Sequence, residues 1–503
     1  MYFETLGCPK NVCDSENAAG ALMEEGFMIA AAPDAADVII VNTCGFIDDA
    51  KRESIAAILD MAEYKKDGKR LVVSGCLSQR YGEDLAGELP EVDRFIGVHD
   101  YGKLPKILRE LLDNGQEAEG ANTAEVQFGG ETAGETGAAN AKPRAEGANT
   151  GVLQLRRKRL EPVYSAYLKA SDGCNNRCSY CVIPFIRGPY SSRPENEIVS
   201  ECEGLVAGGA REIVLIAQDL TAYGYDLHGR FTLPALVRRL CGIEGADWIR
   251  LMYCYEDRVS DELIEVIRSE EKVCNYIDMP LQHISDRILT SMRRRSTQKS
   301  ILNTISRLRT AIPDIAIRTT LITGFPGETD EDFNELLDFV TETKFERLGV
   351  FAYSQEEGTP AAEMKNQIDE EVKQARLEAL MLAQQGISLE KNRAKIGKVL
   401  EVLVEEKDAD GSFIGRTRYD APEIDNGVIF SAGRGLTGSR LSGLDSAAAD
   451  IKPASLTEPR LSGLASAAAD IKPANLTEPR PGDIVMVKIN DAFDYDIAGE
   501  RFI

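Results

Sequence analysis

Short and nearly continuous apolar runs alternate with stretches of helical periodicity along residues 1–112. The expected strands are Tyr2–Leu6, Asp37–Thr43 and Arg70–Gly75, and the stretches between them carry apolar residues three and four positions apart. Continuous apolar strands that alternate with helices are typical of a parallel sheet covered on both faces. Residues 1–112 are therefore predicted to form an α/β domain around a parallel sheet.

A second alternating series runs from residue 161 to residue 360. Its six strand–helix repeats predict a partial (β/α)6 barrel, which is open rather than closed by the full eight strands. One long charged helix, Asp369–Arg393, completes a domain that spans 161–395. The expected barrel strands are Ala166–Ala170, Glu212–Ala217, Trp248–Tyr253, Tyr276–Met279, Ala316–Thr323 and Arg347–Tyr353.

The last part of the chain, 396–503, has short apolar runs that are separated by turn residues. Strands are expected at 399–404, 413–417, 427–430 and 483–489. Short strands of this kind predict a small antiparallel β-barrel. Residues 440–479 hold two nearly identical copies of a 20-residue sequence. Two copies are too few for a solenoid, so the repeat is predicted to be an insertion in a loop.

The segment 113–160, between the first two domains, differs in composition from both. It is rich in Gly, Ala, Glu and Thr and has few large apolar residues. Such a segment cannot bury enough apolar surface to offset the entropy lost on ordering. It is predicted to be a disordered linker.

Charge and cysteine content narrow the class of protein. The chain of 503 residues carries a formal net charge of −24, which disfavours loose binding to nucleic acid and favours attraction to a basic partner. No apolar run is long enough to span a membrane, and the N-terminus lacks the pattern of a signal peptide. The 11 cysteines are too sparse for a disulfide scaffold, so reduced thiols and metal ligands in the cytoplasm are expected.

Three cysteines, Cys174, Cys178 and Cys181, follow the first expected barrel strand at the spacing C-x-x-x-C-x-x-C. Thiolates are the usual ligands of iron–sulfur clusters, and a four-iron cluster held by only three of them keeps one iron open to a small molecule. The position is the C-terminal mouth of the barrel, where the active sites of barrels lie. These loop cysteines predict a 4Fe-4S cluster. The alternatives are a structural zinc site, which normally needs four ligands, and three unrelated buried cysteines.

Three further cysteines, Cys8, Cys44 and Cys76, each follow the carboxyl end of a different expected strand of the first domain. Because ligands bind at the carboxyl ends of parallel strands, these strand-end cysteines are expected to converge although they lie far apart in the sequence. They are interpreted as the ligands of a second cluster, with three separate structural cysteines as the alternative. Cys13 lies in the following helix and is not expected to be a ligand.

Other candidate residues gather at the predicted barrel mouth. Glycines in the run 324–329, after the fifth strand, allow close approach of a ligand, and Glu328 could hold a hydroxyl; a plain tight turn is the alternative. Arg187 and Arg193 flank the loop cysteines and could hold a carboxylate or a phosphate, or they could be ordinary surface arginines. The candidates for cofactor binding are Gln218, Gly324, Gly327 and Glu328, and those for catalysis are Arg187 and His283.

Four runs of residues, 6–11, 353–359, 420–425 and 491–496, carry a resemblance to a known family. With the cysteine spacings, they make the chain similar to the radical S-adenosylmethionine (SAM) methylthiotransferases over essentially its whole length, apart from the linker and the repeat. The resemblance implies an N-terminal methylthiotransferase domain, a radical SAM barrel and a C-terminal TRAM-like barrel. It also implies two 4Fe-4S clusters, SAM and a low-potential electron donor. The loop cysteines would hold the SAM-cleaving cluster, and the strand-end cysteines the auxiliary one.

The chemistry that this resemblance implies has two halves. The reduced radical cluster cleaves SAM to a 5′-deoxyadenosyl radical, which removes a hydrogen from an unactivated carbon. The auxiliary cluster supplies a sulfur group that a second SAM has methylated. An aliphatic C–H is not acidic enough for a side-chain base, so a cofactor must supply the chemistry.

The expected substrate is an aspartate of ribosomal protein uS12, because the four runs are most similar to the branch of the family that modifies it. Pro9 and Lys10 stand where the transfer-RNA branch typically has Gln-Met. Residues 396–503 hold 18 Asp and Glu against 12 Lys and Arg, and an acidic domain suits a basic protein better than RNA.

Acidic runs of the last domain, among them Asp420, Glu423 and Asp425, are expected to face this basic partner, with ordinary solvated turns as the alternative. Two other functions stay open at this point. One is a transfer-RNA methylthiotransferase, and the other is a non-catalytic iron–sulfur or RNA-binding scaffold.

Overall fold

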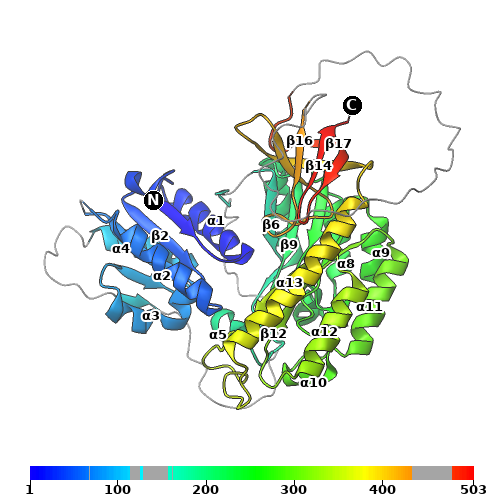
Figure 1. The fold of residues 1–503 in the computed structure, drawn as a ribbon. Helices are drawn as coiled ribbons and strands as arrows, with labels where there is room; N and C mark the ends of the chain where they lie inside the picture. The colour runs from blue at the N-terminus through cyan, green and yellow to red at the C-terminus, as the bar shows by residue number, and fades with distance from the viewer. Residues whose placement is uncertain (67, 114–124, 128–156, 161–162, 433–477, 503) are drawn as a thin grey trace, which may run out of the picture. The chain divides into compact units, whose positions relative to one another are not determined.

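The computed structural model describes residues 1–66, 68–113, 125–127, 157–160, 163–432 and 478–502. These residues form two compact units (Figure 1). The first is Met1–Lys391 together with Arg418–Asp425, and the second is Asn392–Thr417 together with Asn426–Ile503. Most of the predicted linker, and all but the last two residues of the repeat at 440–479, lie outside the described residues.

A five-stranded parallel sheet organises the N-terminal part of the first unit. Its elements are β1 (Tyr2–Thr5), α1 (Pro9–Glu24), β2 (Val38–Thr43), α2 (Asp48–Ala62), β3 (Arg70–Gly75), α3 (Cys76–Glu88), β4 (Arg94–Ile96), α4 (Leu104–Asp113) and β5 (Glu125–Gln127). The strand order is β1-β2-β3-β4-β5, and every neighbouring pair is parallel. The predicted α/β domain is therefore confirmed.

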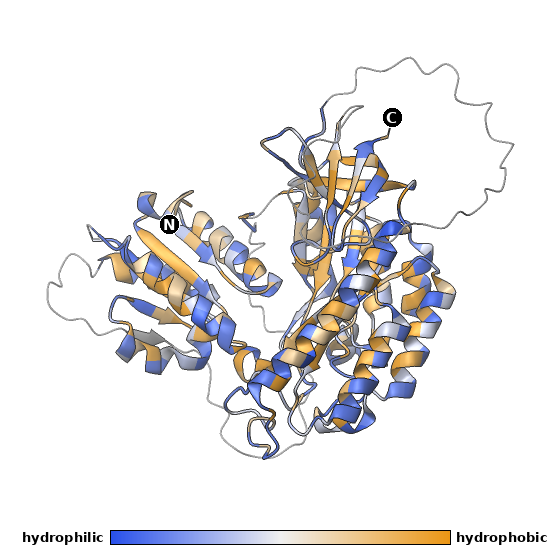
Figure 2. Ribbon diagram, viewed as in Figure 1, coloured by the Kyte–Doolittle hydropathy of each residue, from blue (hydrophilic) through white to orange (hydrophobic). Residues whose placement is uncertain are grey.

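Helices cover both faces of this sheet, which explains the uninterrupted apolar strands. In β2, Val38 and Ile40 pack in one core with α1 and α4, whereas Ile39 and Val41 pack in another with α2 and α3. Every residue of β2 is buried. Figure 2 shows apolar residues concentrated in the strands, while the helices carry apolar and polar positions together. A strand between two apolar layers needs no polar alternation.

The second part of the first unit is the predicted open barrel. Six parallel strands stand in the order β6-β9-β10-β11-β12-β13. They are β6 (Ser165–Lys169), β9 (Glu212–Ile216), β10 (Trp248–Leu251), β11 (Val273–Asp278), β12 (Ala316–Thr323) and β13 (Arg347–Ala352). All six expected strands are found at their predicted places, and their apolar residues form one large core with the surrounding helices.

The remaining elements of this part connect and cover the barrel strands. The helices are α5 (Ile183–Arg187), α6 (Glu195–Ala207), α7 (Tyr225–His228), α8 (Leu233–Cys241), α9 (Asp261–Ser269), α10 (Asp286–Ser291), α11 (Gln298–Ala311), α12 (Asp330–Thr343) and α13 (Glu370–Arg393). A short antiparallel pair, β7 (Ser171–Asp172) and β8 (Ser191–Ser192), brackets the loop cysteines. Residues Thr297 and Thr329 start α11 and α12 with a capping box, which satisfies backbone N–H groups at the first turn.

The segment 418–425 belongs to the barrel part, although it lies in sequence assigned to the last domain. Asp420 accepts a hydrogen bond from Nε of Arg347 at 2.9 Å, and Asp425 pairs with Nε of Arg318 at 3.3 Å. The side chains of both aspartates are only 2% exposed. The expectation that they face a basic partner is therefore wrong for Asp420 and Asp425.

The second unit is a closed barrel, as predicted for the last domain. Its strands are β14 (Val399–Lys407), β15 (Phe413–Thr417), β16 (Val428–Ser431), β17 (Ile484–Ala492) and β18 (Ile497–Arg501), and they close in the order β14-β15-β16-β18-β17. Phe413 and Phe430 stack in its core with ring centroids 5.5 Å apart. The pairs are antiparallel except β16 with β18.

Five short strands escape the sequence analysis: β4, β5, β7, β8 and β18. Each of them has five residues or fewer, which is too short to show a clear period. Strand β5 lies inside the segment predicted to be a linker, so that prediction does not hold for its three residues, which pair with β4. In the described part of the chain, no helix combines the length and apolar character needed to cross a membrane.

Candidate functional site

The hairpin of β7 and β8 closes the base of the loop that carries Cys174, Cys178 and Cys181. The backbone N–H of Cys174 donates to the carbonyl of Gly188 at 3.2 Å. Gly173 has a φ of 74°, and a Cβ at this position would collide with the carbonyl of Pro189. Only glycine fits this close approach of two backbone segments. The closed base turns the loop cysteines back toward one another.

The loop thiols lie close enough for their charges to interact. Burial raises the pKa of Cys174 to about 11. Burial, followed by the nearby thiolates of Cys178 and Cys174, raises the pKa of Cys181 well above its usual value. Three such thiolates are stable together only beside a cationic group, and the iron of a cluster provides one. These residues therefore fit a 4Fe-4S cluster.

A structural zinc site is the alternative to a cluster at the loop cysteines. No group of three or more His, Cys, Asp and Glu side chains among them is arranged to hold one metal ion. A zinc site needs its ligands around one point, whereas the thiolates of a four-iron cluster bind different irons. The identity of the metal group at the loop cysteines therefore stays a prediction from their spacing.

Side chains from other strand-end loops hold the cysteine loop from outside. The amide of Asn176 donates to Asp219 Oδ2 at 2.7 Å, and its Oδ1 accepts from Arg258 at 3.1 Å. The hydroxyl of Tyr255 lies 3.8 Å from Cys178 Sγ. These contacts fix the loop before any ligand binds, which is a requirement for precise chemistry.

Cys8, Cys44 and Cys76 meet at the carboxyl edge of the first sheet. Cys8 precedes α1, Cys44 follows β2, and Cys76 begins α3. Burial and then the charge of Cys8 raise the pKa of Cys44 to about 12. Asn11 ties the same edge together, because its Nδ2 donates to the carbonyls of Leu6 at 2.8 Å and Thr43 at 3.1 Å. The expected convergence of the strand-end cysteines is therefore present, and their role as cluster ligands stays a prediction.

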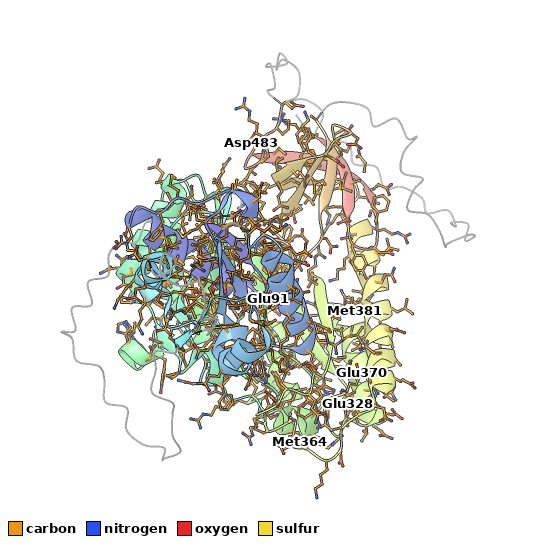
Figure 3. All side chains as sticks on the ribbon, turned by 90° about the vertical axis from the view of Figure 1, so that its left-hand side faces the viewer. Glu91, Glu328, Met364, Glu370, Met381 and Asp483 are labelled. Carbon is orange, nitrogen blue, oxygen red and sulfur yellow. The ribbon has the colours of Figure 1, made fainter. Side chains whose placement is uncertain are left out.

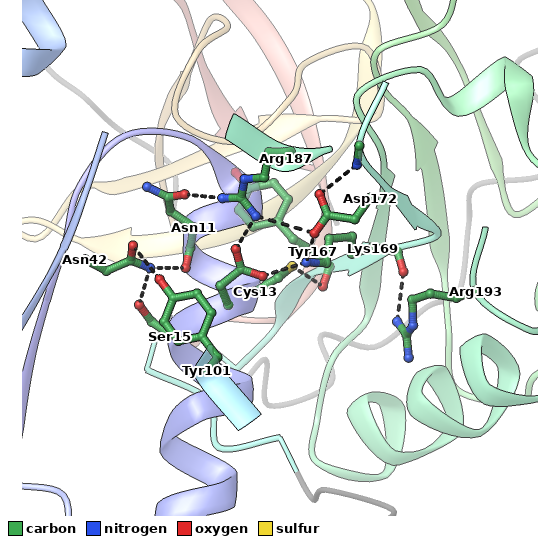
Figure 4. Close-up of polar contacts among 12 residues, drawn as sticks. Asn11, Cys13, Ser15, Asn42, Tyr101, Tyr167, Lys169, Asp172, Arg187 and Arg193 are labelled. Carbon is green, nitrogen blue, oxygen red and sulfur yellow. Dashed lines mark hydrogen bonds and ion pairs between the residues drawn. The ribbon is translucent and has the colours of Figure 1, made fainter. Parts of the chain in front are cut away.

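Arg187, a predicted catalytic candidate, is buried, and Figure 4 shows its polar contacts with Asn11 and Asp172. Its Nη2 donates to Asn11 Oδ1 at 2.7 Å and to Cys76 Sγ at 3.5 Å. Its Nη1 pairs with Asp14 at 2.5 Å and with Asp172 at 3.5 Å. Although burial opposes the charge, Asp14 raises the pKa of Arg187 well above its ordinary value. Arg187 ends the helix that follows the loop cysteines, so it links that loop directly to a strand-end cysteine.

A network of ion pairs, partly buried, extends from Arg187 toward the barrel mouth. Lys169 pairs with Asp14 at 2.6 Å and with Asp172 at 2.9 Å. Burial opposes the charge of Asp172, but Lys169 and Arg187 hold the pKa of this carboxyl well below its usual range. Figure 4 shows these contacts bridging α1 and the strands of the barrel part. The network is rigid because every charge in it has an opposite charge beside it.

Gln218, a predicted cofactor ligand, stands at the edge of this network. Its Nε2 donates to Asp172 Oδ1 at 2.8 Å. Its Oε1 is buried without a hydrogen-bond partner among the described residues. Buried polar atoms are nearly always paired, so this acceptor fits a donor from a bound polar molecule such as SAM. Its contact with SAM stays a prediction.

The glycine-rich turn after β12 is closed by its own glutamate. Gly324 and Gly327 have φ values of 69° and 82°. Glu328 is buried, and both of its oxygens accept from the N–H of Gly324 at 3.0 Å, while Arg376 donates to one of them at 2.7 Å. Arg376 belongs to α13, so this bond joins the turn to that helix; Figure 3 labels Glu328 and Glu370, the first residue of α13. Glu328 therefore has a structural role in this turn, and ligand contacts of the turn stay predictions.

The side chains of His283 and Arg193 both contact other groups of the protein. The ring of His283 is fully buried, its Nδ1 accepts from the N–H of Ser285 at 3.0 Å, and its Nε2 lies 3.4 Å from Glu328. Arg193 donates to the carbonyl of Lys169 at 2.8 Å. These placements suit packing and positioning, so catalysis by His283 stays a prediction without direct support.

Lys10 lies in the run 6–11, which carries part of the family resemblance, but no catalytic or binding role was predicted for it. It lies two residues after Cys8, is 7% exposed, and its Nζ is 3.0 Å from the centroid of the Tyr253 ring. Burial lowers its pKa to about 8. The sequence analysis also predicted no functional role for Asp14 or Asp172. A charged residue within six positions of a candidate cysteine ligand was the only sequence signal available for all three.

Matches to known families cover each part of this chain. Residues 1–97 match the uncharacterized protein family UPF0004, residues 168–340 the radical SAM superfamily and residues 396–443 the TRAM domain. The open barrel and the three-cysteine loop at its mouth agree with the second match. The chain is thus a radical SAM enzyme, a class that uses SAM and a 4Fe-4S cluster.

Curated relatives define the family more narrowly. The ribosomal protein uS12 methylthiotransferase RimO of Geobacter sulfurreducens is 47% identical over 453 residues, which is 89% of this chain and 96% of that protein. RimO of Trichlorobacter lovleyi is 47% identical over 99% of this chain and 96% of that protein, and RimO of Clostridioides difficile is 42% identical over 99% and 98%. The chain belongs to the RimO family of methylthiotransferases.

Proposed function

We propose that the chain adds a methylthio group to the β carbon of an aspartate in ribosomal protein uS12. The observation that carries the proposal is the meeting of the two cysteine sets, where Arg187, six residues after Cys181, donates a hydrogen bond to Cys76. Two clusters, one bound at each cysteine set, would suit a reaction in which one removes hydrogen and the other delivers sulfur. Relatives that are named for this activity match the chain over nearly its whole length.

Two 4Fe-4S clusters and SAM are the cofactors of this proposal. The loop cysteines would hold the cluster that acts on SAM, and the strand-end cysteines would hold the auxiliary cluster. When bound, these groups supply hydrogen-atom removal and sulfur transfer, which no side chain can perform on an aliphatic carbon. Gln218, Gly324 and Gly327 would contact SAM.

In this proposal, the side chains of the protein position the reacting groups and exclude water from them. Asp14 and Arg187, which are buried, form a paired network with Lys169 and the partly exposed Asp172. Such a network keeps its geometry during turnover and keeps solvent from a reactive carbon radical. Its charges also fix the electrostatic field around the strand-end cysteines, because Arg187 contacts Cys76 directly.

The partners of this proposal are uS12, free or within the small ribosomal subunit, and a low-potential electron donor, all in the cytoplasm. With Asp420 and Asp425 buried, the exposed acidic residues of the second unit, such as Glu406, Asp408 and Asp410, are left to attract a basic partner. No observation favours transfer RNA as the substrate.

Mass spectrometry of uS12 tests the function. Anaerobically reconstituted chain, incubated with SAM, a chemical reductant and small subunits that lack the modification, should add one methylthio group to a single aspartate. Omission of SAM is the control and should leave the mass unchanged. Modification of transfer RNA with uS12 left untouched would refute the proposed substrate.

Replacement of Arg187 by Met should alter the auxiliary cluster. The change removes the hydrogen bond to Cys76 Sγ, and hydrogen bonds to cluster sulfurs stabilise the reduced state. We expect a more negative midpoint potential, seen by redox titration with electron paramagnetic resonance, and a loss of about 10- to 100-fold in activity. Arg187→Lys should recover part of both effects.

The exposed Arg109, on α4, offers a matched control. Arg109→Met should leave the potential and the activity at their wild-type values. An unchanged midpoint potential in Arg187→Met would show that this arginine does not act on the cluster.

A further inference from the structure

Lys10 is a buried lysine without an ion-pair partner among the residues that the structure describes. The residue is 7% exposed. Its ammonium lies over the ring of Tyr253, 3.0 Å from the centroid, and no described carboxylate is within ion-pair distance of it. Buried lysines are almost always paired with an opposite charge. A cation–π contact stabilises an ammonium but leaves its hydrogen-bond donors without acceptors.

The carboxylates nearest to Lys10 already form hydrogen bonds with other groups. Asp278 accepts from Nη1 of Arg318 at 3.0 Å and from the N–H of Tyr253 at 3.0 Å. Asp172 accepts from Lys169 at 2.9 Å. The other charged neighbours are Cys8, a candidate cluster ligand, and Arg187, which repels the ammonium. The ammonium of Lys10 therefore has no ion-pair partner among the described residues, and an incoming anion could supply one.

The position of Lys10 relates this anion to the reaction. Lys10 belongs to α1, two residues after Cys8, and its contact Tyr253 follows β10 at the carboxyl end of the barrel sheet. Tyr253 adopts a φ of 62°, which is costly for a tyrosine and marks a backbone held in place by its surroundings. The ammonium thus stands between the strand-end cysteines and the barrel mouth.

We propose that Lys10 binds the carboxylate of the acceptor aspartate and so holds its β carbon between the two cysteine sets. The inference rests on the proposed function and names the residue that selects the acceptor. The carboxylate is bonded directly to the β carbon of an aspartate, so an ammonium on the carboxylate fixes the carbon that reacts. An asparagine or a nucleic-acid base brings no charge to a cation already removed from water, and it binds less well.

Paired peptides test this inference. The probes are a synthetic peptide with the sequence around the acceptor aspartate of uS12 and the same peptide with asparagine at that position. Binding to the reconstituted full chain, with SAM present, is measured anaerobically by fluorescence anisotropy. Lys10→Met should weaken binding of the aspartate peptide about 10- to 100-fold and change binding of the asparagine peptide by less than about threefold, because one charged hydrogen-bonded contact is lost.

Two further variants keep the result interpretable. Lys10→Arg retains the charge and should restore most of the preference for the aspartate peptide. Lys106→Met, at an exposed position of α4, should behave as wild type. The iron content of each variant reports whether it has folded and taken up its clusters.

The outcomes separate this inference from the proposed function. Equal losses for both peptides, or no loss for either, would overturn the role of Lys10 while the function stands. Wild-type chain that binds neither peptide and leaves uS12 unmodified would overturn the function and the inference together. A changed cluster potential with an unchanged peptide preference would assign Lys10 to the cluster alone and would also overturn the inference.

Discussion

Replacing Cys8, Cys44 and Cys76 together with Ala is expected to remove about half of the iron while SAM cleavage continues. Two four-iron clusters give about eight irons per chain, and the two cysteine sets come from separate sheets. Loss of one set therefore leaves the ligands of the other in place. Iron is measured by chemical assay after anaerobic reconstitution, and SAM cleavage is measured as deoxyadenosine formed with a chemical reductant.

The reciprocal change has a different expected result. Alanine at Cys174, Cys178 and Cys181 should remove the other half of the iron and all SAM cleavage. Cys13 is the matched control, since it is buried in α1 and its thiol contacts the carbonyl of Tyr167 at 3.5 Å. Cys13→Ala should keep all the iron. A strand-end triple variant that retains its full iron content would disprove the second cluster.

Replacing Asp420 by Ala is expected to destabilise the protein by about 3–5 kcal/mol. The change leaves the Arg347 guanidinium, which is 5% exposed, without its carboxylate, and breaking a buried pair from one side costs this much. Chemical unfolding of the full chain, followed by circular dichroism, measures the loss. The first unit should account for it, because Asp420 packs on the barrel strands.

The exposed acidic residue Glu406 serves as the control for this change. Glu406→Ala should alter the free energy of unfolding by less than about 0.5 kcal/mol, as surface substitutions usually do. An Asp420→Ala variant that keeps full stability but loses affinity for uS12 would restore the original interpretation of Asp420 as a docking residue.

Asp420 and Glu406 show that the sequence does not predict which acidic residues are buried by tertiary contacts. Both lie in short acidic runs of the last domain, and both have the local pattern of a solvated turn. Only the return of the segment 418–425 to the barrel part puts Asp420 against Arg347. The residues next to an aspartate in the sequence do not determine which distant arginine it pairs with.

The sequence by itself determined the features that depend on short-range pattern. Short apolar runs that alternate with helical patterns located all six barrel strands, although β10 and β12 carry the polar residues Arg250 and Arg318. The spacing of the loop cysteines indicated their chemistry, because one short loop carries all three. The placement of Cys8, Cys44 and Cys76 at the ends of strands predicted their convergence, since parallel strands bring their carboxyl ends to one edge.

The tertiary structure decided every feature that joins distant segments. It placed Arg187 against Cys76 and closed Glu328 onto Gly324. It also buried Lys10 beside Tyr253, with no carboxylate of the described residues paired to it. The physical reason is that the partner of a charged side chain is chosen by how whole elements pack. Local periodicity reports only which face of an element a residue occupies.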